Sequence, residues 1–213
     1  MPIREKLARR ASKAGVSVPG SVSDKLEAYF ELLRKWNRKV SLTALPVEDA
    51  GDEAIDRLLI EPLVAARFLP CRDAVAIDIG SGGGSPAIPL KVLVPGVSMR
   101  MVESKTRKAA FLREVIRALE LDKTEVEAVR FEELLIRPAL HDATDVLTMR
   151  AVKIEAKTLA GLQSFLKPSG LLFLFGTRSG ATKATSSHFP QISTHSLLRQ
   201  WGSQLEILQK RSS

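Results

Sequence analysis

The most distinctive spacing in this sequence is that of an aspartate and the glycines that follow it, DIGSGGG at residues 78–84. The aspartate ends an apolar run at residues 75–77, and Pro86 and Pro89 come after the glycines. A short apolar strand, a glycine-rich turn and a proline-marked helix start predict the first β–α unit of an open parallel sheet. Ligands of such sheets bind beyond the carboxyl ends of the strands, so we predict a binding site at this turn.

The spacing of the glycines distinguishes between two nucleoside cofactors. The dinucleotide fingerprint is G-x-G-x-x-G, and Ser85 stands here where its third glycine belongs. The spacing D-x-G-x-G-x-G resembles instead the first motif of class I S-adenosylmethionine-dependent methyltransferases. That cofactor carries a sulfonium, an ammonium and a carboxylate, and Asp78 suits its cationic groups, directly or through water. A plain glycine turn in another α/β fold is the alternative. The cofactor-binding candidates in this loop are Asp78, Gly80, Gly82 and Gly84.

Further candidates stand at the ends of the next predicted strands. Glu103 follows a strand at 98–102, 23 residues after Gly80, and such an acid can accept both ribose hydroxyls of either S-adenosylmethionine or NAD. After a third strand at about 125–129, Phe131 and Glu132 are placed to flank and read an adenine ring. Arg150 follows a fourth strand at 145–149 and would contact the cofactor or a base edge; a surface ion pair is the alternative.

The formal net charge of +8 is unevenly distributed along the chain. Residues 1–40 hold ten Lys/Arg against four acids, and residues 167–213 hold six against one, whereas the middle is slightly acidic. Basic ends suit a polyanionic partner such as RNA, although a solvated basic surface explains the charge equally well. Lys105, Arg107 and Lys108 begin a predicted helix at 105–120, where cations oppose the helix dipole, so their position favours phosphate binding.

Composition bounds the remaining possibilities. No apolar run approaches the roughly 18 residues of a membrane span, and the N-terminus lacks the apolar core of a secretory signal. The single cysteine, Cys71, excludes an internal disulfide and suits a reducing cytoplasm, where we expect the protein to act. His141, His188 and His195 form no ligand-spaced pair, so we predict no metal.

The elements that must position these residues form an α/β protein. Helices at 3–14, 21–36 and 53–69, the last interrupted by Pro62, predict a helical extension over residues 1–72. Residues 73–213 are expected to form a Rossmann-like, mostly parallel sheet with helices on both faces. After a helix at 155–166 and a turn at 167–170, we expect a fifth strand at 171–175, a polar loop at 177–191 and closing strands at 192–197 and 204–209.

Five stretches together resemble the bacterial 16S rRNA guanine-N7 methyltransferase G family, also called glucose-inhibited division protein B. The stretches are Trp36-Asn37 with 41–44, DIGSGGGSPAIPL at 78–90, Glu103 through Leu112, RFEEL at 130–134 and MRAV at 149–152. The resemblance implies a class I methyltransferase fold, S-adenosylmethionine as donor, 16S rRNA as substrate, and cofactor contacts at Gly80, Ser85, Phe131, Glu132 and Arg150. The chain departs from the family pattern at Leu58, Glu61, Ser85, Ala87 and Phe175.

The resemblance also fits the lack of an evident catalytic base. N7 of guanine carries a free lone pair, so its methylation needs only the alignment of N7, methyl carbon and sulfur, which can contribute about 7–11 kcal/mol. Arg150 would be the catalytic positioning residue. We expect a monomer that binds the small ribosomal subunit or its 16S rRNA through Asn37, Arg38, Lys39, Thr43, Lys105, Arg107, Lys108 and Arg178. A methyltransferase for another RNA base, a protein or a small molecule, and a non-catalytic RNA-binding relative, remain alternatives; an NAD-dependent oxidoreductase fails on the glycine spacing.

Overall fold

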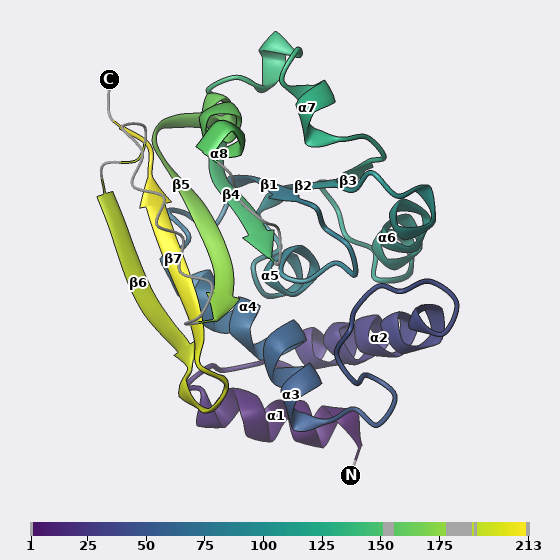
Figure 1. The fold of residues 1–213 in the computed structure, drawn as a ribbon. Helices are drawn as coiled ribbons and strands as arrows, with labels where there is room; N and C mark the ends of the chain where they lie inside the picture. The colour runs from purple at the N-terminus through teal and green to yellow at the C-terminus, as the bar shows by residue number, and fades with distance from the viewer. Residues whose placement is uncertain (1, 151–155, 178–188, 190, 212–213) are drawn as a thin grey trace.

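The computed structural model describes residues 2–150, 156–177, 189 and 191–211, which form a sheet with helices on both faces (Figure 1). The strand order is β3-β2-β1-β4-β5-β7-β6. The strands are β1 (Val75–Ile79), β2 (Ser98–Val102), β3 (Thr124–Glu127), β4 (Thr144–Arg150), β5 (Leu166–Thr177), β6 (Gln191–Leu198) and β7 (Ser203–Gln209). Strands β1 to β5 run parallel, and β7 runs antiparallel to both β5 and β6. The predicted α/β fold is confirmed.

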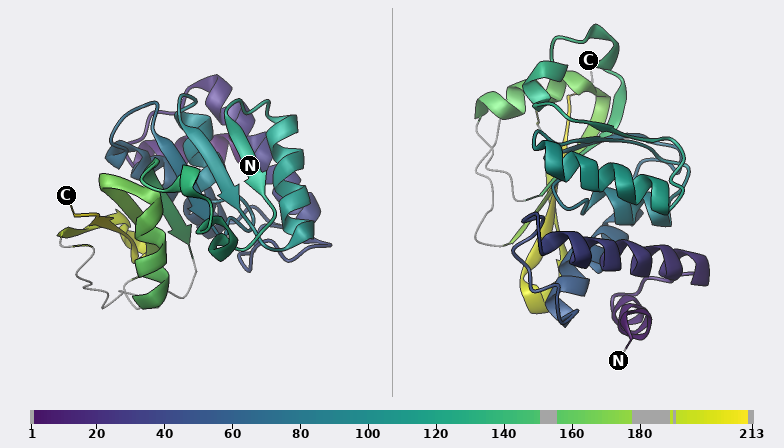
Figure 2. Two further views of the ribbon diagram at one scale, coloured as in Figure 1. Left: turned by 90° about the horizontal axis from the view of Figure 1, so that it is seen from above. Right: turned by 90° about the vertical axis from the view of Figure 1, so that its right-hand side faces the viewer.

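Helices cover the two faces of this sheet unequally (Figures 1 and 2). One face carries α5 (Ala87–Leu93) and α6 (Thr106–Ala118), and the opposite face carries the short helices α7 (Phe131–Leu134) and α8 (Ala156–Leu162). Outside α5 and α6 lies a further layer made by α1 (Ile3–Lys13) and α2 (Gly20–Asn37). One cluster of buried side chains runs from α1 and α2 into the sheet, so the N-terminal helices share the core of the strands. The boundary at residue 72 stays a prediction.

The helical segment before β1 changes its winding around Pro62. It passes through α3 (Asp52–Ile55), a π-helix (Asp56–Ile60), α4 (Glu61–Ala65) and a 3₁₀ turn (Ala66–Phe68). Proline has no N–H to donate to the carbonyl four residues earlier, which here belongs to Leu58. Ser85 Oγ donates to that carbonyl at 2.8 Å. The interruption expected at Pro62 is therefore a local rewinding, and it joins this segment to the end of the glycine loop.

The C-terminal half of the sheet differs from expectation in one place. The turn predicted at residues 167–170 lies inside β5, because Leu166 already pairs with Thr144 and the register then shifts before Val146 pairs with Leu171. Ser169 has a φ of 63°, so the backbone bulges and continues as a strand. The two closing strands are confirmed as β6 and β7. Most of the predicted loop at 177–191 lies outside the described residues.

No helix within the described ranges is long and apolar enough to cross a membrane.

Candidate functional site

The glycine loop leaves the carboxyl end of β1 and turns back into α5. The N–H groups of Gly80 and Ser81 donate to the carbonyl of Val102 at 2.9 and 3.1 Å, which holds the loop against the end of β2. Gly82 and Gly84 have φ angles of 52° and 90°, a left-handed conformation that residues with a Cβ rarely adopt. The predicted glycine turn at the carboxyl ends of the strands is therefore present, with positive φ angles that only glycine adopts easily.

Residues of the N-terminal segment, distant in sequence, contact this loop and hold its backbone in place. The fully buried hydroxyl of Tyr29 in α2 donates to the carbonyl of Gly83 at 2.6 Å. A Cβ on Gly83 would stand 3.1 Å from Leu33 Cδ1 and 3.3 Å from the carbonyl of Leu42, so the loop lies directly on the N-terminal segment. Burial raises the pKa of Tyr29 well above its usual value, which keeps this hydroxyl a donor. The sequence shows Tyr29 only as part of an apolar helix face, and nothing in it indicates this contact.

Glu103, at the end of β2, is tied to the same loop. Its Oε2 accepts the N–H of Gly82 at 2.9 Å, and its Oε1 accepts the N–H of Lys105 at 2.7 Å. Each carboxylate oxygen has a second lone pair, so the side chain can still accept hydrogen bonds from a ribose. The proposed ribose contact of Glu103 stays a prediction, and the structure adds a second task, which is to fix the backbone of the glycine loop.

Asp78 is the acid at the centre of the site. Its side chain is buried, and Oδ1 accepts a hydrogen bond from Thr148 Oγ1 of β4 at 2.5 Å. Its Oδ2 is also buried, and none of the described residues forms a hydrogen bond with it. Burial raises the pKa of Asp78 to about 6, while the hydroxyls of Ser81 and Thr148 and the charge of Arg150 lower it. A buried acceptor without a partner fits a cationic ligand group, as the amino group of S-adenosylmethionine would be.

Arg150 ends β4 one residue beyond Met149, which pairs with Ile79 of β1. Its Nη1 donates to Glu61 Oε2 at 2.7 Å, and its guanidinium carbon lies 4.8 Å from the centre of the Phe175 ring. The side chains of Arg150 and Glu61 are only 16% and 2% exposed, so Arg150 does form an ion pair, but this pair is largely buried and not on the surface. The cofactor contact of Arg150 stays a prediction. Glu61 stands out in the sequence only as a departure from the family pattern.

The remaining cofactor candidates occupy the neighbouring edge of the site. Phe131 and Glu132 begin α7 after a three-residue connection from β3. Phe131 is half-buried and packs against the core cluster of the α7–α8 face, whereas Glu132 is exposed. Ser85 is buried, and its hydroxyl donates to Leu58, away from the loop backbone. The adenine contacts of α7 and the cofactor contact of Ser85 stay predictions.

The basic residues expected to contact RNA fall on adjacent helix ends. Trp36, near the end of α2, lies against Phe111 of α6 with ring centres 5.8 Å apart. The end of α2 and the first turns of α6 are therefore neighbours, and their exposed cations can serve one surface. These are Arg38 and Lys39 after α2 and Lys105 and Arg107 at the start of α6, with Lys108 half-buried; Arg38 also pairs with the exposed Glu48 at 2.9 Å.

Two of the expected RNA contacts are less exposed than predicted. Asn37 is half-buried, and its Oδ1 accepts the N–H groups of Leu42 and Thr43 at 2.9 and 3.0 Å. Thr43 is also half-buried, and its hydroxyl accepts the N–H of Leu45 at 3.1 Å. Backbone donors after a helix end need acceptors, and these side chains supply them. Arg178 lies outside the described residues, and RNA binding by the whole group stays a prediction.

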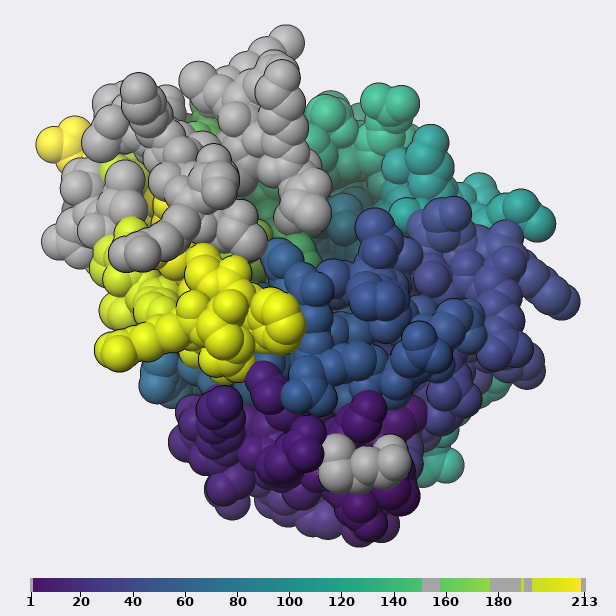
Figure 3. Space-filling model, turned by 60° about the horizontal axis from the view of Figure 1, so that its bottom comes forward, coloured from purple at the N-terminus to yellow at the C-terminus, as the bar shows by residue number. Residues whose placement is uncertain are grey.

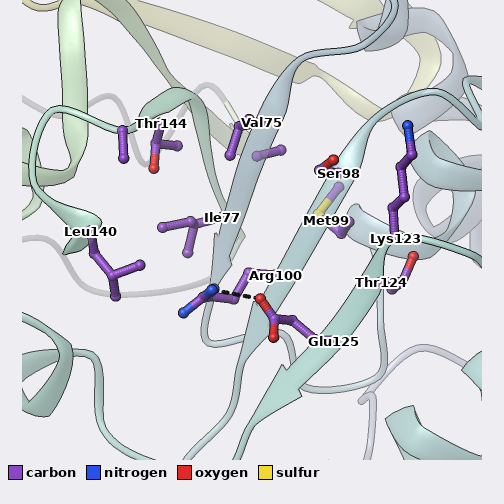
Figure 4. A pocket seen from close by; sticks show the side chains of 12 residues that line it. Val75, Ile77, Ser98, Met99, Arg100, Lys123, Thr124, Glu125, Leu140 and Thr144 are labelled. Carbon is purple, nitrogen blue, oxygen red and sulfur yellow. Dashed lines mark ion pairs between the residues drawn. The ribbon is translucent and has the colours of Figure 1, made fainter. Parts of the chain in front are cut away.

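A pocket of about 480 Å³ lies elsewhere, over the first residues of the parallel strands (Figure 4). Val75, Ile77 and Leu140 supply its apolar lining. Its central charges satisfy each other, because Arg100 pairs with Glu125 at 2.6 Å. The glycine loop follows the opposite, carboxyl ends of the same strands, so this pocket is separate from the candidate site. Among the described residues, no three His, Cys, Asp or Glu side chains gather as metal ligands would.

The strand order with its antiparallel seventh strand, the glycine loop after β1 and the acids ending β1 and β2 define a class I S-adenosylmethionine-dependent methyltransferase. The buried, unpartnered oxygen of Asp78 and the glycine cradle fit that cofactor. Residues 22–196 match the GidB family, described as rRNA small subunit methyltransferase G. The chain belongs to this family, and the resemblance seen in the sequence is confirmed.

Individual relatives agree with this assignment. A protein of Halorhodospira halophila named ribosomal RNA small subunit methyltransferase G is 34% identical over 177 residues, covering 82% of this chain and 79% of the relative. The crystal structure of MtNAS in complex with MTA and tNA superposes with a TM-score of 0.63 at 16% identity, covering 87% of this chain and 72% of that one. Precorrin-6y C5,15-methyltransferase of Geobacter metallireducens reaches a TM-score of 0.50 at 17% identity, over 71% of this chain and 87% of that one. The two structures support the fold.

Replacing Gly82 with valine is expected to weaken binding of S-adenosylhomocysteine at least tenfold. A left-handed conformation costs a residue with a Cβ about 1–2 kcal/mol, so the loop would shift and release the bond from Gly82 to Glu103. Isothermal titration calorimetry measures the change. Gly15→Val is the matched control, because Gly15 also has a positive φ of 70° and open space where a Cβ would stand, but lies between α1 and α2. Equal affinities for wild type and Gly82→Val would mean that the cofactor binds elsewhere.

Proposed function

We propose that this methyltransferase transfers a methyl group from S-adenosylmethionine to N7 of a guanine in 16S ribosomal RNA. The observation that carries the proposal is the match of residues 22–196 to the rRNA small subunit methyltransferase G family. The site supports it independently. The N–H of Lys105 donates to Glu103, so the basic start of α6 directly adjoins the acid that we propose as the ribose contact.

The residues of the chain divide the binding of the cofactor among three strand ends. Asp78 would accept a hydrogen bond from the ammonium of the methionyl group, and Glu103 would accept hydrogen bonds from the ribose hydroxyls. The start of α7 would lie along the adenine. When bound, S-adenosylmethionine supplies an electrophilic methyl group on its sulfonium. Because N7 of guanine has a free lone pair, no side chain must remove a proton. The task of the protein is to hold donor and base in line at about 3–3.5 Å, with water excluded.

The exposed cations after the end of α2 and at the start of α6 would bind the phosphates that flank the target base. Phosphate contacts fix the position of RNA without reading its sequence, so these cations supply affinity and orientation. The target guanine must lie in a loop or single strand, where a base can be turned out of the stack.

Methyl transfer onto RNA tests the proposal. Small ribosomal subunits from cells that lack the gene are incubated with the protein and S-adenosylmethionine labelled in its methyl group. We expect label in 16S rRNA at one guanine. Chemical cleavage of the RNA chain at that position, to which an N7-methylated guanine is susceptible, then identifies the methylated atom. Label on another base would overturn the N7 assignment. No label in RNA under any subunit or salt condition would overturn RNA methylation itself.

Salt dependence separates RNA from protein or small-molecule substrates. For RNA, the logarithm of affinity falls with the logarithm of salt by about 0.7 per phosphate contact. Arg107→Gln and Lys108→Gln each remove at most one phosphate contact, so each is expected to lower the magnitude of this slope by about 0.7 or less. Lys13→Gln, at the exposed last residue of α1, serves as the control and should leave the slope unchanged. A flat salt dependence for the wild type would favour another class of substrate.

A further inference from the structure

Unpartnered buried polar atoms are concentrated at one point of the molecule. Within the described residues, the buried side-chain nitrogen and oxygen atoms without a hydrogen-bond partner are Glu61 Oε1, Asp78 Oδ2, and Nε and Nη2 of Arg150. Glu61 bonds Arg150, and Arg150 ends the strand next to Asp78. Buried polar groups in folded proteins nearly always have partners, so a cluster that lacks them indicates a ligand.

The unpartnered atoms of Arg150 have a definite geometry. Nε and Nη2 carry the two parallel N–H groups along one edge of the guanidinium, and Nη1, on the other side, is occupied by Glu61. A free edge of this kind matches the two oxygens of a carboxylate. The unpartnered oxygen of Asp78 beside it requires a donor, preferably a cation. One ligand that supplies both partners is an α-amino acid group, and S-adenosylmethionine ends in one.

Alternative acceptors for this edge fit less well. An RNA phosphate offers oxygens to Arg150 but supplies no donor to Asp78. The Arg150 side chain is also only 16% exposed, and a polyanionic backbone binds more readily to the exposed cations at α2 and α6. The edge therefore suits the carboxylate of the cofactor better than the nucleic acid.

We propose that Glu61 is a positioning residue, which holds Arg150 so that its Nε–Nη2 edge faces the carboxylate of the methionyl group of the cofactor. The inference rests on the proposed use of S-adenosylmethionine at this site. Glu61 fixes the guanidinium from one side through the 2.7 Å bond to Nη1, and the Phe175 ring supports its flat face. The Glu61 side chain is almost fully buried in α4, so its own rotamer is fixed by the surrounding core.

Two ligands that differ only at the methionyl end test this role. S-adenosylhomocysteine carries the amino acid group, and 5′-methylthioadenosine lacks it. In Glu61→Gln, we expect affinity for S-adenosylhomocysteine to fall about tenfold or more, because a misaligned charge-assisted pair loses its two-point contact. Affinity for 5′-methylthioadenosine should stay within about twofold, since the nucleoside contacts do not involve Arg150. Both are measured by calorimetry.

The matched control is Asp52→Asn. Asp52 begins the same helical segment and pairs with Arg10 at 2.9 Å, whereas Glu53 is unsuitable because its partner Arg57 also lies 4.0 Å from Glu61 Oε1. Both ligands should bind this variant as they bind the wild type. Phe175→Leu provides a second variant in case Glu61→Gln folds poorly; it leaves the ion pair in place and should show a smaller loss that is again confined to S-adenosylhomocysteine.

Equal losses for the two ligands, or no loss for S-adenosylhomocysteine, would overturn the role of Glu61. Either result would leave the proposed function intact if the wild type still methylates 16S rRNA. Absence of RNA methylation by a wild type that binds S-adenosylhomocysteine would instead overturn the substrate and leave the role of Glu61 standing.

Discussion

Replacing Asp78 with asparagine is expected to weaken binding of S-adenosylhomocysteine about 100-fold, since removing one partner of a buried charge pair costs about 2–5 kcal/mol. The carboxylate is buried and its Oδ2 has no hydrogen-bond partner in the described part of the chain, so its charge is available to the ammonium of the ligand. Asparagine keeps the size of the side chain and the contact with Thr148, but it carries no charge. Calorimetry with S-adenosylhomocysteine measures the loss.

The same substitution is expected to stabilise the protein in the absence of ligand. Burial raises the pKa of Asp78 from 3.8 to about 6, so between these values the folded state holds a proton that the unfolded state has lost. The free energy of unfolding therefore decreases as pH rises through this window, by about 3 kcal/mol in total at about 1.36 kcal/mol per pH unit. Asp78→Asn avoids this loss and should be the more stable protein above pH 6, with little difference below pH 4, as urea unfolding would show.

The pH dependence of binding shows whether Asp78 contributes to ligand affinity through its negative charge or only through the shape of its side chain. In the wild type, affinity for S-adenosylhomocysteine should fall as pH decreases below about 6, because protonated Asp78 no longer attracts the ammonium. Asp78→Asn should bind weakly at every pH between about 5 and 8. An asparagine variant that binds as tightly as the wild type would show that Asp78 does not contact the cationic end of the ligand.

Local sequence patterns are sufficient to predict the glycine loop and the strand and helix on either side of it. The apolar run of β1, the glycines and the prolines before α5 lie within one short stretch, and the predicted bounds of β2, residues 98–102, coincide with those of the structure. Such local signals depend on backbone preferences and on burial of a single strand, which a sequence displays directly. The acids at the ends of β1 and β2 follow from the same pattern.

The contacts that fix the side chains of the site are not local. Glu61 and Arg150 are separated by 89 residues, and Tyr29 and Gly83 by 54. Nothing in the residues around Glu61 distinguishes a buried carboxylate from an exposed one on an amphipathic helix. Asn37 is a second example, since a polar residue beside Arg38 and Lys39 is predicted as an RNA contact, and the sequence does not indicate that its side chain also accepts backbone N–H groups.

Asp56 is a further residue whose importance arises only from the fold. It lies in the π-helix, is fully buried, and accepts hydrogen bonds from Nε and Nη2 of Arg10 in α1. Gln200 Nε2 and Trp201 Nε1, from the turn between β6 and β7, donate to it at 3.0 and 2.7 Å. The carboxylate also holds the pKa of Arg10 above its usual value. The purple, blue and yellow segments of the chain meet on this face of the molecule (Figure 3).

Replacing Asp56 with alanine is therefore expected to lower the free energy of unfolding by about 3–5 kcal/mol, since it removes the buried carboxylate that accepts hydrogen bonds from Arg10, Gln200 and Trp201 and leaves their buried donors without this acceptor. Asp52→Ala is the matched control. Asp52 pairs with the same arginine at 2.9 Å but its side chain is 41% exposed, and such pairs contribute about 0–1 kcal/mol. Urea unfolding followed by circular dichroism compares the two variants. If their stabilities agree within about 1 kcal/mol, burial of Asp56 does not set the strength of the contact. In that case the other contacts of these segments, such as the bond from Lys6 Nζ to the carbonyl of Ala50 and the apolar packing of α1, would account for their attachment to the core.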